Sequence, residues 1–80
     1  MHYVYLLQSQ RNPASHYVGY SADLKSRLAS HNAGQNQSTI SNRPWNLAGY
    51  FAFPDERKAR DFEKYLKSGS GRTFAKRHFY

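Results

Sequence analysis

The segment Tyr17-Val18-Gly19-Tyr20-Ser21, continued to His31, decides the predicted fold. Its aromatic and β-branched residues favour a strand, which stops at a glycine and leads into a helix. Ser21 is the expected N-cap of this helix, Asp23 lies in its first turn, where the helix dipole favours an anion, and Gly34 follows its last turn. The segment therefore predicts a strand joined directly to a helix.

One side of this helix combines apolar and basic residues. Positions i, i+3, i+4 and i+7 share a helix face. Here they are occupied by Leu24, Arg27, Leu28 and His31. With the leucines inward, Arg27 and His31 lie at the edge of the apolar stripe, near the strand that carries Tyr17. A phenol, a guanidinium and an imidazole at such a junction suit a phosphate-handling site. The alternative is a solvated flank in which His31 favours the helix C-terminus through the dipole.

Length and composition restrict the class of protein. Eighty residues make one domain, residues 1–80, with a modest core. Without cysteine there is no disulfide and no thiolate metal site, and a reducing, cytoplasmic setting fits. The apolar run at the N-terminus is short, so we expect neither a signal peptide nor a membrane span.

The charge balance is the most informative bulk property. Twelve Lys and Arg against five Asp and Glu give a net charge of +7, and four of the five acids lie between Asp55 and Glu63. Seven Tyr, five Phe and one Trp are interleaved with the basic residues. This combination favours a polyanionic partner, most simply nucleic acid. The alternative is a charge that serves solubility alone.

The alternation of apolar and polar residues predicts an antiparallel sheet of three strands. Residues 2–7 read as the first strand, and the polar turn after them is too short for a parallel crossover. Residues 16–20 therefore pair with them antiparallel. Residues 47–53 form the third strand, in which apolar residues at both parities indicate that both faces are covered.

For the first two strands we expect a register in which Tyr5 lies opposite Tyr17. Tyr3 then lies opposite Gly19, whose missing side chain leaves room for a ring. In this arrangement Tyr5 and Tyr17 are cross-strand neighbours on one face.

Two further helices follow the third strand. A helix over Glu56–Lys67 is capped by Pro54-Asp55, and a shorter one begins after Ser70-Gly71. We expect their inward residues to be Ala59, Phe62 and Leu66, and Phe74, Ala75, His78 and Phe79. The fold is thus a small α/β (α+β) domain, a three-stranded antiparallel sheet flanked by about three helices in the order β-β-α-β-α-α.

A polar segment, Gly34–Asn46, separates the first helix from the third strand. Long loops in small domains are usually functional or disordered. No acid lies between residues 24 and 54 or after residue 63. This loop and the basic third helix therefore form the predicted nucleic-acid footprint. Its expected contact residues are Thr39, Arg43, Arg72, Lys76 and Arg77.

Glu63 lies beside the apolar stripe of its helix rather than opposite it. This position suits a catalytic or metal-binding carboxylate. The alternative is a structural ion pair with Lys67, four residues later, or with Arg60. Spacing alone leaves both interpretations open.

In order and spacing, these residues resemble the GIY-YIG nuclease family from residue 2 to the end of the chain. The ordered set is far more specific than either tripeptide alone. Its members are Tyr3-Val4-Tyr5, Tyr17-Val18-Gly19, Arg27, His31 and Glu63. The segment Leu66–Ala75 is similar to short, stand-alone bacterial members, whose relatives include intron homing endonucleases and the nuclease module of the excision-repair incision subunit.

The resemblance implies a metal-dependent endonuclease that hydrolyses phosphodiester bonds in DNA. Branched, flapped or single-stranded structures are the implied substrates, with DNA preferred over RNA and Mg²⁺ or Mn²⁺ as the cofactor. Glu63 is the implied metal ligand. The implied catalytic residues are Tyr5, Tyr17, Arg27, His31 and Glu63.

Two departures from the family pattern bear on activity. Tyr20 stands where a lysine often follows the second motif, and residues 68–73 contain no equivalent of the asparagine that many members carry. A non-catalytic nucleic-acid-binding module is therefore the alternative function, and a basic adaptor for an acidic protein is a third.

The base that activates water is open between two residues. A free tyrosine has a pKa of about 10, so Tyr17 needs nearby positive charge to act as a phenolate. His31, with an ordinary pKa of about 6.5, can activate the water or polarise Tyr17.

Overall fold

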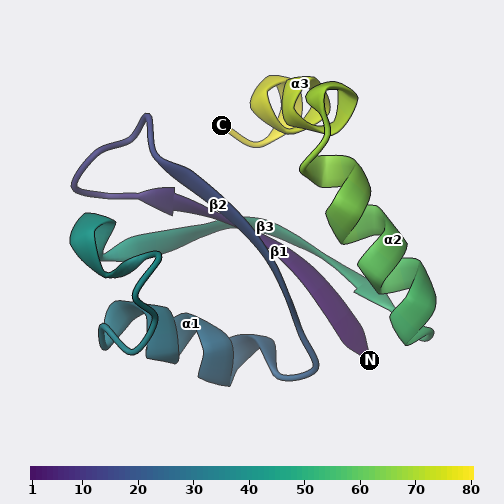
Figure 1. Ribbon diagram of the computed structural model, residues 1–80, viewed down its shortest axis with the longest axis horizontal. Coiled ribbons are helices and arrows are strands. Elements are labelled where there is room, and N and C mark those ends of the chain that lie inside the picture. The colour runs from purple at the N-terminus through teal and green to yellow at the C-terminus, as the bar shows by residue number, and fades with distance from the viewer.

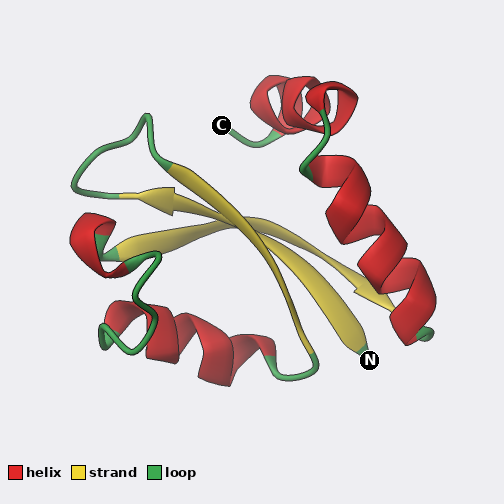
Figure 2. Cartoon of the chain, viewed as in Figure 1, coloured by secondary structure: helices red, strands yellow, loops and turns green.

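The computed structural model describes residues 1–80 and contains one antiparallel sheet with helices on both faces (Figures 1 and 2). The strands are β1 (His2–Ser9), β2 (His16–Ser21) and β3 (Trp45–Phe53), and the helices are α1 (Leu24–Asn32), α2 (Glu56–Leu66) and α3 (Gly69–His78). A short 3₁₀ turn, η1 (Ile40–Asn42), lies between α1 and β3. The predicted order β-β-α-β-α-α is confirmed. No helix is both long and apolar enough to cross a membrane.

β1 is the central strand, because the sheet order is β2-β1-β3. It pairs antiparallel with both neighbours, and its residues 4–7 are buried. A central strand that is covered by helices on both faces of the sheet needs apolar side chains at both odd and even positions. This explains the run Val4-Tyr5-Leu6-Leu7.

The register of β1 and β2 differs from the prediction by two residues. Tyr5 faces Gly19, Leu7 faces Tyr17, and Tyr3 faces Ser21. β1 runs two residues further than expected, and the turn closes where the Ser9 amide donates to the Ser15 carbonyl at 3.0 Å. Because side chains alternate with a period of two, this shift leaves Tyr5 and Tyr17 on the same face.

Each face of the sheet has its own core. On one side Val4 and Leu6 pack with residues of α2 and α3, namely Ala59, Leu66 and Ala75. On the other side Tyr5, Leu7 and Trp45 are buried together, with Tyr17, Leu24 and Leu28 packed around them. The inward leucines of α1 and the apolar stripe of α2 are thus confirmed. His78 was predicted to face inward on α3 but is exposed.

β3 was predicted to be covered on both faces, and this is wrong. Tyr50 is 52% exposed and Leu47 is 37% exposed. β3 is an edge strand of nine residues, about 30 Å long, whereas the nine-residue α1 is only about 14 Å long. One short helix does not cover the whole strand. Trp45, predicted to lie in the loop, begins β3 and is buried.

The helix caps agree with the sequence at α2 but not at α1. Asp55 caps α2 by accepting from the Arg57 amide at 2.9 Å. In α1 the N-cap is Asp23, which accepts from the Ser26 amide at 3.1 Å, rather than Ser21. The Ser21 hydroxyl instead closes a turn with the Asp23 backbone. Helix α3 begins three residues earlier than predicted, at Gly69, because Ser68 is its cap.

Candidate active site

Tyr5 and Tyr17 meet at Gly19, which lies opposite Tyr5 in the sheet. A Cβ atom at Gly19 would stand 2.5 Å from Cζ of Tyr5 and 3.0 Å from Cε2 of Tyr17. The glycine therefore lets the ring of Tyr5 cross β2. The centroids of the two tyrosine rings lie 6.2 Å apart as a result.

His31 continues this arrangement into the α1 side of the molecule. It is fully buried, its Nε2 lies 2.9 Å from the Tyr5 hydroxyl, and its Nδ1 lies 2.8 Å from Oγ1 of Thr39. The Thr39 hydroxyl also lies 3.4 Å from the Asn36 carbonyl, which can only accept a proton. We therefore assign the imidazole proton to Nδ1, which donates to Thr39, so that Nε2 accepts the proton of Tyr5.

Three sequence-based expectations change here. His31 is neither at a solvated flank nor at the edge of the apolar stripe, because both ring nitrogens have protein partners and the imidazole is buried without an unpaired polar atom. Its bonded tyrosine is Tyr5, not Tyr17, whose ring only packs edge-on at a centroid distance of 5.0 Å. Thr39, expected on the nucleic-acid surface, is buried and holds His31 instead.

The electrostatics of the site keep the buried pair neutral. Burial raises the pKa of Tyr5 well above its ordinary value, Tyr17 and Glu63 raise it further, and Arg27 opposes them. Burial also lowers the pKa of His31, and Arg27 lowers it further. Tyr17, Arg27 and Glu63 thus all lie close enough to act on the charge of Tyr5, although they come from three different elements.

Arg27 and Glu63 differ in their ion pairing. Arg27 is exposed one turn before His31, and all three ion pairs of the molecule lie on α2. Glu63 is in two of them, with its Oε2 3.0 Å from Nζ of Lys67 and its Oε1 3.7 Å from Nη1 of Arg60. The ion-pair alternative for Glu63 is therefore present in the structure beside its electrostatic link to Tyr5.

Tyr20, at the position of the family's lysine, lies on the α2 side of the sheet. Its hydroxyl lies 2.7 Å from Nδ1 of His2. The guanidinium carbon of Arg60 stands 3.7 Å above the centre of its ring. This tyrosine is thus held by packing and one hydrogen bond.

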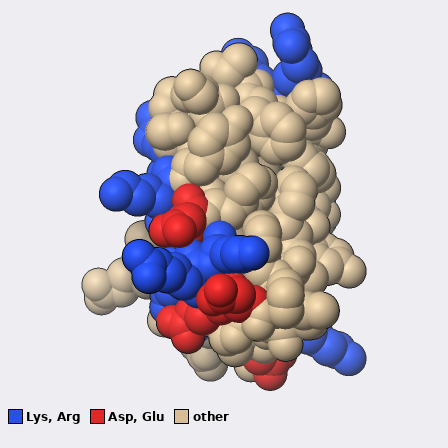
Figure 3. All heavy atoms as spheres, turned by 90° about the vertical axis from the view of Figure 1, so that its right-hand side faces the viewer, with Lys and Arg blue, Asp and Glu red and all other residues tan.

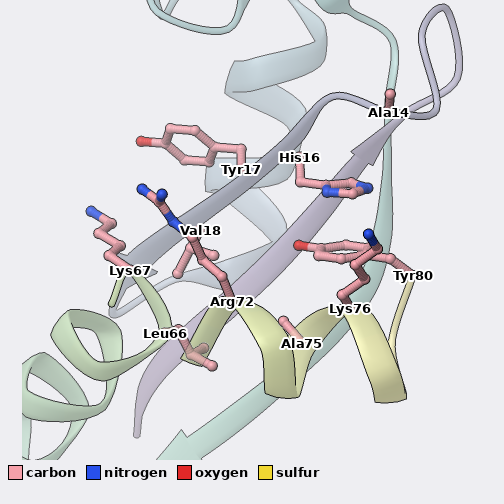
Figure 4. A pocket seen from close by; sticks show the side chains of 10 residues that line it. All are labelled: Ala14, His16, Tyr17, Val18, Leu66, Lys67, Arg72, Ala75, Lys76 and Tyr80. Carbon is pink, nitrogen blue, oxygen red and sulfur yellow. The ribbon is translucent and has the colours of Figure 1, made fainter. Parts of the chain in front are cut away.

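Tyr17 also lines a pocket of about 550 Å³ between the β2 edge and the α2–α3 corner (Figure 4). Three basic side chains line it, Lys67, Arg72 and Lys76, and no Asp or Glu does. The other lining residues are Ala14, His16, Val18, Leu66, Ala75 and Tyr80. Part of the predicted footprint is thus next to a predicted catalytic tyrosine.

The rest of the predicted footprint lies elsewhere. Arg43 stands beside Gly34 on the α1 side, and Arg77 does not line the pocket. Three pocket residues were not expected from the sequence. They are Lys67, which was expected only as an ion-pair partner of Glu63, and His16 and Tyr80. Only His16 had a local signal, since it directly precedes Tyr17 on an edge strand.

The side chains fit a divalent ion only as a site completed by substrate. Nowhere do three or more His, Cys, Asp or Glu side chains gather into a metal cage. Glu63 offers one hard carboxylate. Mg²⁺ is commonly held by one or two carboxylates, its own waters and substrate phosphates, so this donor set suits weak binding that tightens with a phosphate present.

The comparisons with known proteins identify the family of this chain. The GIY-YIG catalytic domain family matches residues 1–77, which include all five predicted catalytic residues. The chain is 33% identical over 72 residues to the UPF0213 protein BH0048 of Halalkalibacterium halodurans, which covers 89% of this chain and 74% of that protein. The solution NMR structure of the UPF0213 protein BH0048 from Bacillus halodurans has a TM-score of 0.56 and 32% identity, over 94% of this chain and 79% of that one. The chain therefore belongs to the GIY-YIG family of nuclease domains.

Proposed function

We propose that this protein is a metal-dependent endonuclease that hydrolyses phosphodiester bonds in DNA, with branched, flapped or single-stranded structures as substrates. The observation that carries the proposal is the meeting of Tyr5, Tyr17 and His31 across Gly19, with Arg27 and Glu63 close enough to act on Tyr5. The basic pocket beside Tyr17 supports a polyanionic substrate.

Arg27 is the phosphate-binding residue of this proposal. Its guanidinium is permanently charged, can donate two parallel hydrogen bonds to a phosphate, and is in no ion pair. A permanent positive charge on Arg27 would stabilise the negative charge that develops on the phosphate oxygens in the transition state.

The burial of His31 supports Tyr17 as the base. Water cannot reach the imidazole, because it is fully buried and both nitrogens are bonded. Tyr17 is half-buried and lines the pocket, so its hydroxyl can meet an attacking water. Tyr5 is buried as well and donates its proton to His31, so its part in this proposal is to position the ring of Tyr17. His31 and Thr39 then act as positioning residues for Tyr5.

Glu63 would hold the Mg²⁺ or Mn²⁺ ion. When bound, the ion supplies charge stabilisation at a phosphate oxygen. Glu63 must then loosen its ion pair with Lys67. Because Lys67 also lines the pocket, its ammonium is then available to a substrate phosphate.

A gel cleavage assay on single-stranded, duplex and branched DNA, with Mg²⁺, Mn²⁺ or a chelator, tests the proposal. The matched variants are Glu63→Gln and Glu56→Gln, since both carboxylates lie on α2 and pair with Arg60, at 3.7 and 3.8 Å. We expect Glu63→Gln to abolish metal-dependent cleavage with little loss of DNA affinity, and Glu56→Gln to cut within about twofold of wild type.

The ion pairs of Glu63 favour one second candidate, a nucleic-acid-binding module without turnover. Salt-dependent DNA binding with no cleavage under any metal would support it. Equal loss of thermal stability in both glutamate variants, with cleavage intact, would assign Glu63 a structural role only.

A further inference from the structure

His16 and Tyr80 form a flat aromatic stack on the wall of the pocket (Figure 4). Their ring centroids are 3.6 Å apart and their planes differ by 1°. His16 comes from the edge strand β2, and Tyr80 follows α3, so the fold returns the end of the chain to the β2 edge (Figure 1). His16 is exposed, which leaves its imidazole accessible to a further planar group.

The hydroxyl of Tyr80 has no partner in the protein. It is the one buried side-chain polar atom that makes no hydrogen bond. Burial raises the pKa of Tyr80 to about 12, so the hydroxyl keeps its proton and can donate it. In Figure 4 this hydroxyl points into the pocket, where a bound polar group could satisfy it.

Two cations flank the stack. Arg72 and Lys76 are one helical turn apart on α3, both line the pocket, and neither is in an ion pair. The pocket volume of about 550 Å³ is within the range of sites for single small ligands. Such a pocket can hold one nucleotide of a strand but not a duplex.

We propose that this pocket is a subsite for an unpaired nucleotide strand beside Tyr17. One base stacks on His16, the Tyr80 hydroxyl donates to that nucleotide, and Arg72 and Lys76 bind the flanking phosphates. Stacking on aromatic rings, with cations along the backbone, is the usual way in which proteins hold single strands. Binding of the strand in this pocket does not depend on the proposed nuclease function. Only the assignment of the strand as part of a substrate rests on that function.

The test measures affinity in chelator, without turnover, by fluorescence anisotropy of a labelled oligothymidine and of a labelled DNA hairpin. We expect His16→Ala to weaken oligothymidine binding by about tenfold, the effect typical of one lost base stack, and hairpin binding by less than about twofold. His78→Ala is the matched control, because His78 is exposed on α3 outside the pocket.

Two conservative variants separate stacking from folding. His16→Phe keeps a flat ring and should retain oligothymidine affinity within about twofold. Tyr80→Phe removes only the unpartnered hydroxyl, so it should weaken oligothymidine binding by about threefold without lowering the melting temperature.

Unchanged oligothymidine affinity in His16→Ala would overturn the subsite, and so would an equal loss on oligothymidine and hairpin. Cleavage by the wild-type protein is scored separately. If His16→Ala loses single-strand affinity while no substrate is cut, the subsite stands and the nuclease proposal fails. If branched DNA is cut and His16→Ala binds oligothymidine like wild type, the nuclease proposal stands and the subsite fails.

Discussion

A single missing side chain, at Gly19, lets the ring of Tyr5 cross β2 and reach both His31 and Tyr17. Tyr5 is buried on the central strand and has no room to withdraw. At the scale of single residues, the geometry of the site therefore depends on a glycine that carries no chemistry of its own.

Gly19→Ala tests this dependence. Its methyl group would stand 2.5 Å from Cζ of Tyr5, so the ring must leave its hydrogen bond with His31. We expect a loss of about 1–3 kcal/mol in urea unfolding, as for other overpacked sites, together with loss of cleavage. Gly69→Ala is the control, because nothing lies within 4 Å of a Cβ there. Wild-type stability and cleavage in Gly19→Ala would show that the site tolerates a different position of Tyr5.

Tyr17→Phe tests the assignment of the base. The variant keeps the ring that packs against Tyr5 and His31, so its melting temperature should barely change. Single-turnover cleavage should fall by roughly 10²-fold or more, the usual contribution of general acid–base catalysis. Tyr50→Phe, on the exposed side of β3, should cut like wild type. Wild-type cleavage by Tyr17→Phe would remove this tyrosine from the mechanism.

At the scale of elements, α1 is fixed by hydrogen bonds as much as by apolar packing. His31 is its one buried residue. The imidazole joins α1 to β1 through Tyr5 and to the following loop through Thr39, whose carbonyl accepts from Nε1 of Trp45 at 2.9 Å. A helix, two strands and a loop thus share one buried network, and the loop is ordered by it.

This network makes stability depend on pH. The folded pKa of His31 is lower than its ordinary value of 6.5, chiefly because of burial and secondly because of Arg27, so the unfolded chain binds this proton more readily. The contribution of His31 is then fully present above about pH 6.5 and is lost as the pH falls toward the folded pKa. The free energy of unfolding in urea should therefore decline as the pH falls below about 6.5.

Histidine variants check that result. His31→Gln should lower stability at neutral pH but flatten the decline below about pH 6.5, since glutamine does not titrate. His78→Gln, an exposed position, should retain the wild-type slope. A wild-type slope in His31→Gln would assign the pH dependence to another group.

At the scale of the whole molecule, charge is distributed unevenly. Four of the five acids lie on α2 or at its cap, where they alternate with Lys and Arg (Figure 3). Every ion pair is on this helix. The cations of α3 and of α1 are in no ion pair, and two of them, Arg72 and Lys76, line the pocket at the β2 edge, where their charge is free to meet a polyanion.

Salt titration of DNA affinity checks this distribution. Neutralising Arg72 and Lys76 together by glutamine should reduce the slope of log K against log salt by about one to two, because each lost phosphate contact removes roughly 0.7–0.9. Neutralising Arg57 and Lys58, which lie among the acids of α2, is the equal-charge control and should change the slope little. Equal effects of the two pairs would mean that net charge, and not the pocket, sets the affinity.

Much of this protein was determined by local sequence. Strand alternation and helical stripes predicted the element order, Asp55 predicted the start of α2, and Ala59 with Leu66 predicted its inward face. These features depend on residues within one or two turns of each other, so their signals are complete in a short segment. The ordered tyrosines, Arg27 and Glu63 likewise predicted the family.

The tertiary structure alone decided how distant segments meet. The register that puts Gly19 under Tyr5 depends on where the β1–β2 turn closes, which spacing did not reveal. The burial of His31 depends on Thr39, a loop residue that supplies the second hydrogen bond. A polar side chain is buried when partners from other segments satisfy it, and those partners are brought together only by the fold. The stack of His16 on Tyr80, 64 residues apart in the chain, arises in the same way.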